Sequence, residues 1–167
     1  MNNKSFQYFV EGEDEKKLLT TLKNQLGVIQ AGKVQKLNVI EEKISTNIIR
    51  TLKKGTIAIL VFDTDTNNVD ILNWNIKMLN ESHVISKVIT VPQVKNLEDE
   101  LIRSCDIKNI KELLNSRSKK DFKSDLIHVT NLDIKLKEHN FDISLFWNKQ
   151  PNKPYQNINN ESIEIKK

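Results

Sequence analysis

Residues 56–65 read TIAILVFDTD, an apolar run that ends in two aspartates. The run from Thr56 to Phe62 is partly β-branched and almost without polar residues, which is typical of a central parallel strand covered on both faces. In an open parallel sheet, ligands bind beyond the carboxyl ends of the strands. Asp63 and Asp65 therefore stand where a ligand site is expected, and in extended backbone their side chains share one side.

Around this strand, strand-like and helix-like patterns alternate, which predicts βα units. Further strands are expected at residues 5–10, 33–40 and 84–91, and helices at 13–26, 41–54, 69–80 and 97–105. The sequence therefore predicts the α/β class and a Rossmann-like fold. Its central sheet is expected to be mostly parallel, with about four strands flanked by helices.

The chain predicts one domain with a helical extension. This domain is expected over residues 1–148, with an α/β core at 5–105, an extension at 106–148 and a flexible tail at 149–167. Within the extension we expect helices at 107–114 and 119–138, a break near Asn131 and a packing strand or extended arm at 141–147. The prediction of a flexible tail rests on the Pro and Asn residues of this segment. The alternation of Ile163 and Ile165 indicates an edge strand as the alternative.

Composition places the chain among ordinary soluble globular domains. It has 167 residues, of which 38% are hydrophobic and 29% charged. The longest apolar run, 57–62, is far shorter than the roughly twenty residues that span a bilayer, and the first residues contain no apolar signal-peptide core. We expect a cytoplasmic protein without a membrane partner. Cys105 is the only cysteine, so an internal disulfide and a zinc ribbon are both excluded.

A second acidic stretch points to a metal site. Glu11 follows the strand at 5–10, and Glu15 lies four residues later, one turn into the next helix. Carboxylates from separate strand ends can together hold Mg²⁺, which prefers oxygen ligands and leaves positions for phosphate oxygens. We therefore expect Glu11, Glu15, Asp63 and Asp65 to converge. The alternative is that acids in a first helical turn only favour the helix dipole.

Two further charged groups are candidates for the same site. Glu98 and Glu100 lie in the opening turn of the helix expected at 97–105. Residues 108–123 carry six basic side chains against two acidic ones, an excess equal to the net charge of the chain, +4. A phosphate-binding face is one interpretation, and a solvated lysine-rich surface is the other. The candidate nucleic-acid-binding residues there are Arg117, Lys119, Lys120 and Lys123.

The strand ending in Val10-Glu11-Gly12 and the strand ending in Asp63-Thr64-Asp65 resemble a Toprim domain, the metal-binding module of topoisomerases, bacterial primases and OLD-family nucleases. The resemblance runs from about Ser5 to Arg103. It implies that Glu11 is the glutamate of the first motif, that Glu15 is the additional acid of OLD-like members, and that Asp63 and Asp65 are the paired aspartates.

OLD-like members also use a further acid and a downstream lysine for a second metal ion and the phosphate. The matching candidates are Glu98 or Glu100 for the acid and Lys119, Lys120 or Lys123 for the lysine, with Lys120 assigned to the catalytic role. The chain departs from topoisomerases and primases after Asp65, where Thr66-Asn67-Asn68 stands in place of a third acidic position. The resemblance therefore favours the nucleases.

The expected function is phosphodiester hydrolysis of RNA or DNA that depends on Mg²⁺ or Mn²⁺. A role in phage defence is implied by the resemblance alone. Three alternatives stay open. The aspartate pair also fits a haloacid-dehalogenase-like phosphatase, in which Asp63 is the nucleophile, although Glu11 is then unexplained. A sugar-nucleotide transferase can use an Asp-x-Asp site, and a non-catalytic or partner-dependent subunit of an ATPase complex would have no activity alone.

Overall fold

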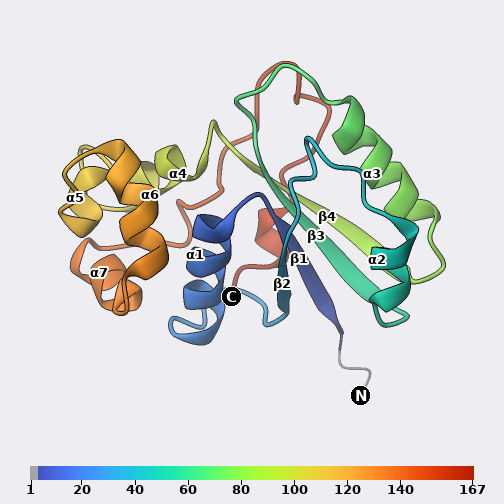
Figure 1. Ribbon diagram of the computed structural model, residues 1–167, viewed down its shortest axis with the longest axis horizontal. Helices are drawn as coiled ribbons and strands as arrows, with labels where there is room; N and C mark the ends of the chain where they lie inside the picture. Colours follow the sequence, from blue (N-terminus) through green and yellow to red (C-terminus); the bar gives the residue numbers. More distant parts are fainter. Residues whose placement is uncertain (1–3) are drawn as a thin grey trace.

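The computed structural model describes residues 4–167, and residues 1–3 of the predicted domain lie outside this part. Four strands form one sheet in the order β2-β1-β3-β4, and each neighbouring pair is parallel (Figure 1). The strands are β1 (Phe6–Val10), β2 (Lys33–Lys36), β3 (Thr56–Asp63) and β4 (Ile85–Gln93). The predicted α/β class and the parallel sheet of four strands are confirmed.

Helices cover both faces of the sheet (Figure 1). One layer contains α1 (Glu13–Asn24), α4 (Leu97–Ser104), α5 (Lys111–Leu114), α6 (Lys119–His128) and α7 (Leu132–Glu138), and the other contains α2 (Thr46–Thr51) and α3 (Asp70–Glu81). β3 is buried on both sides because its side chains alternate between two cores. Ile57, Ile59 and Val61 pack in the core of α1, and Ala58, Leu60 and Phe62 pack in the core of α3.

The predicted helix at 41–54 is shorter in the structure, where α2 begins only at Thr46. The buried side chain of Asn75 explains the difference. Its Nδ2 donates to the carbonyl groups of Val39 and Glu42 at 2.9 and 2.8 Å, and its Oδ1 accepts from the N–H of Ile44 at 2.8 Å. These bonds satisfy the backbone in a turn, so the helical pattern of residues 41–45 is overridden by a tertiary contact.

The packing strand or extended arm predicted at 141–147 is wrong. The segment forms turns, because Asp142 Oδ1 accepts from the N–H and the hydroxyl group of Ser144 at 2.8 and 2.6 Å. The carbonyl group of Asp142 accepts from the N–H groups of Leu145 and Phe146. Local bonds thus occupy the donors that a strand would offer to a neighbour. The break expected near Asn131 is confirmed, since α6 ends at His128 and α7 begins at Leu132.

Residues 149–167 pack on the sheet, where the sequence predicts a flexible tail. Tyr155 is fully buried and stacks on Phe62 with ring centroids 6.1 Å apart. Beside the edge of β4, Glu161 Oε2 accepts from the N–H of Thr90, and Thr90 Oγ1 donates to the carbonyl group of Asn159. The alternative of an edge strand is not realised in this described segment, where a 3₁₀ turn, Ser162–Glu164, precedes a single bridge between Lys166 and Ile29.

Among the described helices, none combines the length and apolar character that crossing a bilayer requires.

Candidate metal centre

The acidic residues lie where the strand order reverses. β1 has β2 on one side and β3 on the other, so the connections after these strands diverge, and ligands of open α/β sheets bind at such a switch point. Glu11 directly follows β1, Glu15 lies in the first turn of α1, and Asp63 ends β3. One carboxylate oxygen from each of the three lies within 4.8 Å of the others. The structure therefore brings together Glu11, Glu15 and Asp63, three of the four acids that were expected to converge.

The turn between β1 and α1 sets the position of Glu15. The N–H of Gly12 donates to Glu15 Oε2 at 3.0 Å, and this bond turns the carboxylate back toward the end of β1. A Cβ atom at position 12 would lie 3.1 Å from the same oxygen and 2.7 Å from Asp14 Oδ1. Glycine therefore allows the backbone to approach the carboxylate closely. Glu15 is buried, with 4% of its surface exposed.

Three carboxylates at this distance repel one another when all are ionised. Burial, followed by the charge of Glu11, raises the pKa of Asp63 to about 8. Burial also raises the pKa of Glu15, with Asp14 and Asp63 adding to the effect, and burial and the charge of Asp65 raise that of Glu11. A bound cation would remove this penalty, because an opposite charge favours the ionised carboxylates. The electrostatics thus fit a cation site.

Asp65 stands at the rim of the group. Its side chain is exposed, and it is not among the three acids whose oxygens lie within 4.8 Å. Its charge nevertheless raises the pKa of both Glu11 and Asp63, so it lies near them. The next residue, Thr66, has its hydroxyl group 2.6 Å from that of Tyr155. Asp65 therefore sits on a loop that begins at the group of three and is held by the C-terminal segment.

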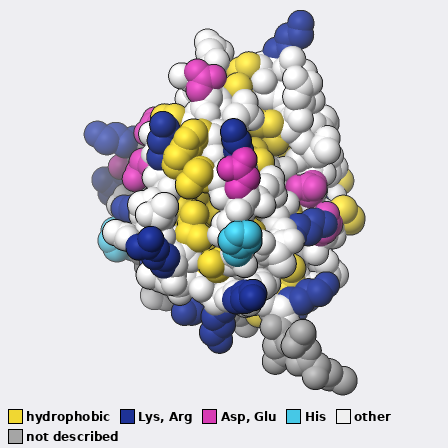
Figure 2. Space-filling view, turned by 90° about the vertical axis from the view of Figure 1, so that its right-hand side faces the viewer, with side chains coloured by type: hydrophobic (Ala, Val, Ile, Leu, Met, Phe, Trp, Pro, Cys, Tyr) yellow, Lys and Arg dark blue, Asp and Glu magenta, His cyan; other side chains and the backbone are white. Residues whose placement is uncertain are grey.

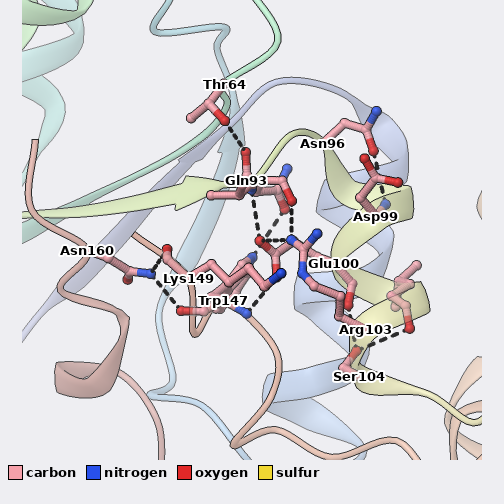
Figure 3. A network of polar contacts seen from close by, with 12 residues as sticks. Thr64, Gln93, Asn96, Asp99, Glu100, Arg103, Ser104, Trp147, Lys149 and Asn160 are labelled. Atoms are coloured by element: carbon pink, nitrogen blue, oxygen red, sulfur yellow. Dashed lines mark hydrogen bonds and ion pairs between the residues drawn. The ribbon is translucent and has the colours of Figure 1, made fainter. Parts of the chain in front are cut away.

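Glu98 and Glu100 have different environments. The charge of Glu98 raises the pKa of Asp63, which places it near the group of three. Glu100 is fully buried, and both of its oxygens are occupied: Oε1 accepts from the N–H of Val94 and faces Arg103 at 2.6 Å, and Oε2 accepts from the N–H of Trp147 at 2.9 Å (Figure 3). The structure thus places Glu100 in a buried polar network, apart from the group of three acids, and these donors occupy both of its oxygens.

Among the candidate basic residues, the structure places Lys123 against the acids. Its Nζ lies 3.5 Å from Glu98 Oε1. Partial burial lowers the pKa of Lys123, but the carboxylates of Glu98, Asp14 and Glu15 raise it by more. Arg117, Lys119 and Lys120 are exposed, and no ion pair joins them to an acid within residues 4–167. Of the candidate lysines, the structure thus places Lys123, rather than Lys120, beside the acids.

Sequence reasoning missed two residues beside the acids. Gln93 ends β4, is fully buried, and donates from Nε2 to Asp63 Oδ1 at 2.7 Å. The available signal was its position, since it is a polar residue at the carboxyl end of a strand. Tyr155 lies within reach of the charges of Asp65, Asp63 and Glu11, which raise its pKa after the larger effect of burial. Its sequence surroundings, rich in Pro and Asn, gave no such signal.

The face formed by α2 and α3 is chemically different. Figure 2 shows a narrow strip of hydrophobic side chains there, with charged side chains scattered around it. A hollow of about 390 Å³ on this side is lined by Ile49, Met78 and Val84 together with Thr46, Arg50, Glu81, Ser82 and His83. It contains one acid, Glu81, and so lacks the convergent carboxylates that distinguish the ends of β1 and β3.

Comparison of the chain with known protein families, with characterised proteins and with solved structures finds no match.

Proposed function

We propose that this protein is a Toprim-type phosphodiester hydrolase that uses Mg²⁺ or Mn²⁺. The observation that carries the proposal is the convergence of Glu11, Glu15 and Asp63 within 4.8 Å at the switch point of the sheet. All three offer carboxylate oxygens, the ligands that these hard cations prefer. A set of three protein ligands also leaves coordination positions for water and for phosphate oxygens. The residues present thus fit the ion.

Each residue has a distinct role in this proposal. Glu11, Glu15 and Asp63 would hold the ion, and Asp65 and Glu98 at the rim would hold a second one. The bound ions would activate water and stabilise the leaving oxygen. In the reaction, the oxygen of water would form a bond to phosphorus as the water gives up a proton to solvent. The bond from phosphorus to the leaving oxygen would break, and that oxygen would take a proton from solvent. Lys123, 3.5 Å from Glu98, would offset the negative charge that develops on the phosphate.

Nucleic acid is the proposed substrate because a basic segment adjoins the acids. Residues 108–123 supply the excess of positive charge, and α6 carries Lys119, Lys120 and Lys123 on the element that reaches the site. Lysines of this kind neutralise backbone phosphates. A phosphatase of the haloacid-dehalogenase type is less well supported, because such an enzyme has no use for Glu11 and Glu15 beside Asp63.

The test is a cleavage assay. The full chain is incubated with single-stranded and duplex DNA and RNA in Mn²⁺ or Mg²⁺, with EDTA as the control. We expect cleavage that EDTA removes and that is lost in Glu11→Gln. A dehalogenase-type phosphatase would instead hydrolyse para-nitrophenyl phosphate and tolerate Glu11→Gln. Absence of cleavage with all substrates and both ions, from protein that binds Mn²⁺, would contradict the hydrolase.

Lys123 and Lys119 provide a matched pair for the role of the basic helix. If Lys123 stabilises charge in the transition state, Lys123→Gln should lower kcat by about 100-fold with little change in KM. Lys119→Gln removes the same charge from an exposed position of the same helix. It should change only the salt dependence of binding. Steady-state kinetics at two salt concentrations measure both effects. Equal kcat values for the two variants would remove Lys123 from the mechanism.

A further inference from the structure

We propose that Gln93 is a positioning residue that fixes the carboxylate of Asp63 for the metal ion, and that Trp147 orients Gln93 for this task. The inference rests on the proposed function. Asp63 and Gln93 are register partners at the ends of β3 and β4, and Nε2 of Gln93 donates to Asp63 Oδ1 at 2.7 Å. An ionised carboxylate has about four acceptor positions. One bond from Gln93 therefore fixes its orientation and leaves the other positions for a cation.

The side-chain amide of Gln93 has an oxygen and a nitrogen at its end, and only the nitrogen can donate a hydrogen bond to Asp63. If the amide turned over, its oxygen would face the carboxylate and repel it. Trp147 prevents this, because its indole Nε1–H can only donate and lies 3.2 Å from Gln93 Oε1 (Figure 3). The indole therefore holds the oxygen on its own side and directs Nε2 toward Asp63. Both Gln93 and Trp147 are fully buried, so water does not compete for these groups.

The backbone of Trp147 is held in an uncommon conformation. Its φ is +55°, in the left-handed region that bulky residues rarely adopt. Its N–H donates to Glu100 Oε2, and its carbonyl group accepts from Asn160 Nδ2 at 2.8 Å and from Ser162 Oγ at 2.7 Å. Such a conformation persists only where surrounding contacts determine it, and these conformations cluster at functional sites. The C-terminal segment thus supplies the contacts that place the indole against Gln93.

The main chain of Gln93 is also bonded to the loop that follows Asp63. Its carbonyl oxygen accepts from the N–H and the hydroxyl group of Thr64 at 3.1 and 2.9 Å (Figure 3). The end of β4 therefore holds the residue after Asp63 through its main chain and Asp63 itself through its side chain. Outer partners of this kind orient the direct ligands of metal ions, and their loss costs about 10- to 100-fold in metal affinity.

The experiment measures Mn²⁺ affinity and the indole N–H resonances of the full chain. Gln93→Met keeps the length of the side chain without a donor, and Trp147→Phe keeps an aromatic ring without the N–H. Each should weaken Mn²⁺ binding by about tenfold. Because both act through one hydrogen-bonded unit, the double variant should lose little more than either alone. Gln156→Met, at an exposed position, is the control and should bind like the wild type.

The spectroscopic measurement separates positioning from general structural support. The chain has two tryptophans, and Trp74 lies on α3 beneath Lys43, on the other face of the sheet. In wild-type protein, Mg²⁺ should shift the indole resonance of Trp147 and leave that of Trp74 in place. Gln93→Met should abolish this shift. The wild-type comparison of the two resonances needs no variant, so it holds even if Gln93→Met fails to fold.

The outcomes distinguish the inference from the proposed function. Suppose that the wild type binds Mn²⁺ and that Glu11→Gln weakens this binding. If folded Gln93→Met then binds Mn²⁺ as tightly as the wild type, the metal site is supported but Gln93 has no positioning role. The conclusion is the same if Mg²⁺ binds to the wild type but does not shift the indole resonance of Trp147. If the wild type binds neither ion, the metal site itself is refuted, and the inference is refuted with it.

Discussion

Asp63→Asn is expected to abolish metal-dependent cleavage and, at the same time, to stabilise the metal-free protein. Loss of a direct ligand should lower kcat/KM by more than about 100-fold, because even outer partners of a metal site are worth 10- to 100-fold. The same change removes one of three mutually repelling carboxylates at the ends of β1 and β3. Without metal at pH 8, we expect a gain on the order of 2 kcal/mol, or about 4–8 °C in Tm for a chain of this size.

The gain should depend on pH in a defined direction. The pKa of Asp63 is raised to about 8 in the folded protein, above its ordinary value of 3.8. Between these values the folded state binds more protons than the unfolded state, so the stability contributed by Asp63 is complete below about pH 4 and is lost as the pH rises through about 8. Asn resembles the protonated side chain. Wild type and Asp63→Asn should therefore melt alike near pH 4 and separate as the pH rises.

Thermal melting in EDTA and in saturating Mg²⁺, between pH 4 and pH 8, measures these effects. Wild-type protein should gain about 2.7 kcal/mol when the Mg²⁺ concentration is 100 times Kd, and Asp63→Asn should gain far less at the same concentration. Asp106→Asn is the matched control, since Asp106 is exposed and lies outside the group of three. If Asp63→Asn is less stable than wild type at pH 8 without metal, the carboxylates are not in electrostatic conflict.

Glu100→Ala is expected to be the most destabilising single change at the site, with a cost of about 3–5 kcal/mol. The carboxylate of Glu100 accepts from the N–H groups of Val94 and Trp147 and pairs with Arg103 at 2.6 Å. Its removal leaves two backbone donors and a largely buried guanidinium group without their acceptor. Burial of such groups without partners is costly because they also lose their hydration. Urea denaturation measures the change in the free energy of unfolding.

Glu98→Ala is the control for this prediction. It lies two residues earlier on α4, faces Lys123 and the acids, and is partly exposed. We expect this variant to lose less than about 1 kcal/mol of unfolding free energy, because the ion pair of Glu98 with the exposed Lys123 is accessible to solvent. We also expect it to bind Mn²⁺ more weakly. The two variants should thus separate stability from metal binding. Equal destabilisation by both would mean that the buried contacts of Glu100 do not decide its effect.

The convergence of Glu11 and Asp63 was predictable because it follows from topology. Once β1 and β3 are assigned as parallel neighbours, residues at their carboxyl ends must lie at one edge of the sheet. Phe9 pairs with Leu60, and this register brings the two acids together. Glu15 was predictable for a related reason, since it lies one turn into the helix that follows Glu11.

The contacts of Glu98 and Glu100 were not predictable in the same way. Both lie in the first turn of α4, and the sequence does not show how that helix is rotated against its neighbours. The answer depends on Trp147, whose N–H reaches Glu100 from 47 residues away. Which of Lys120 and Lys123 lies beside the acids was unpredictable for the same reason. It depends on the rotation of α6, which is fixed by the burial of Phe122 and Leu126.

The C-terminal segment shows where composition misleads. Its many Asn residues and its Pro residues predict a flexible tail. In the structure these polar side chains make specific bonds instead, among them Asn160 Nδ2 to the carbonyl groups of Trp147 and Lys149. Composition records how much apolar surface a segment carries, but not whether its amides find partners. The acids are thus predictable from the sequence, whereas the contacts that support them arise only in the folded chain.

The position of residues 159–164 along β4 has a consequence for solubility. A strand at the border of a sheet presents unpaired backbone groups on which another chain can pair and aggregate. On β4, Thr90 donates hydrogen bonds to Glu161 and to the carbonyl group of Asn159, and Lys87 forms an ion pair with Glu164. The opposite border, β2, spans only four residues and has a lysine at each end. Within residues 4–167, the borders of the sheet are therefore poorly suited to pairing with a strand of another molecule. This protects the protein from aggregation, although its central strand is almost entirely apolar.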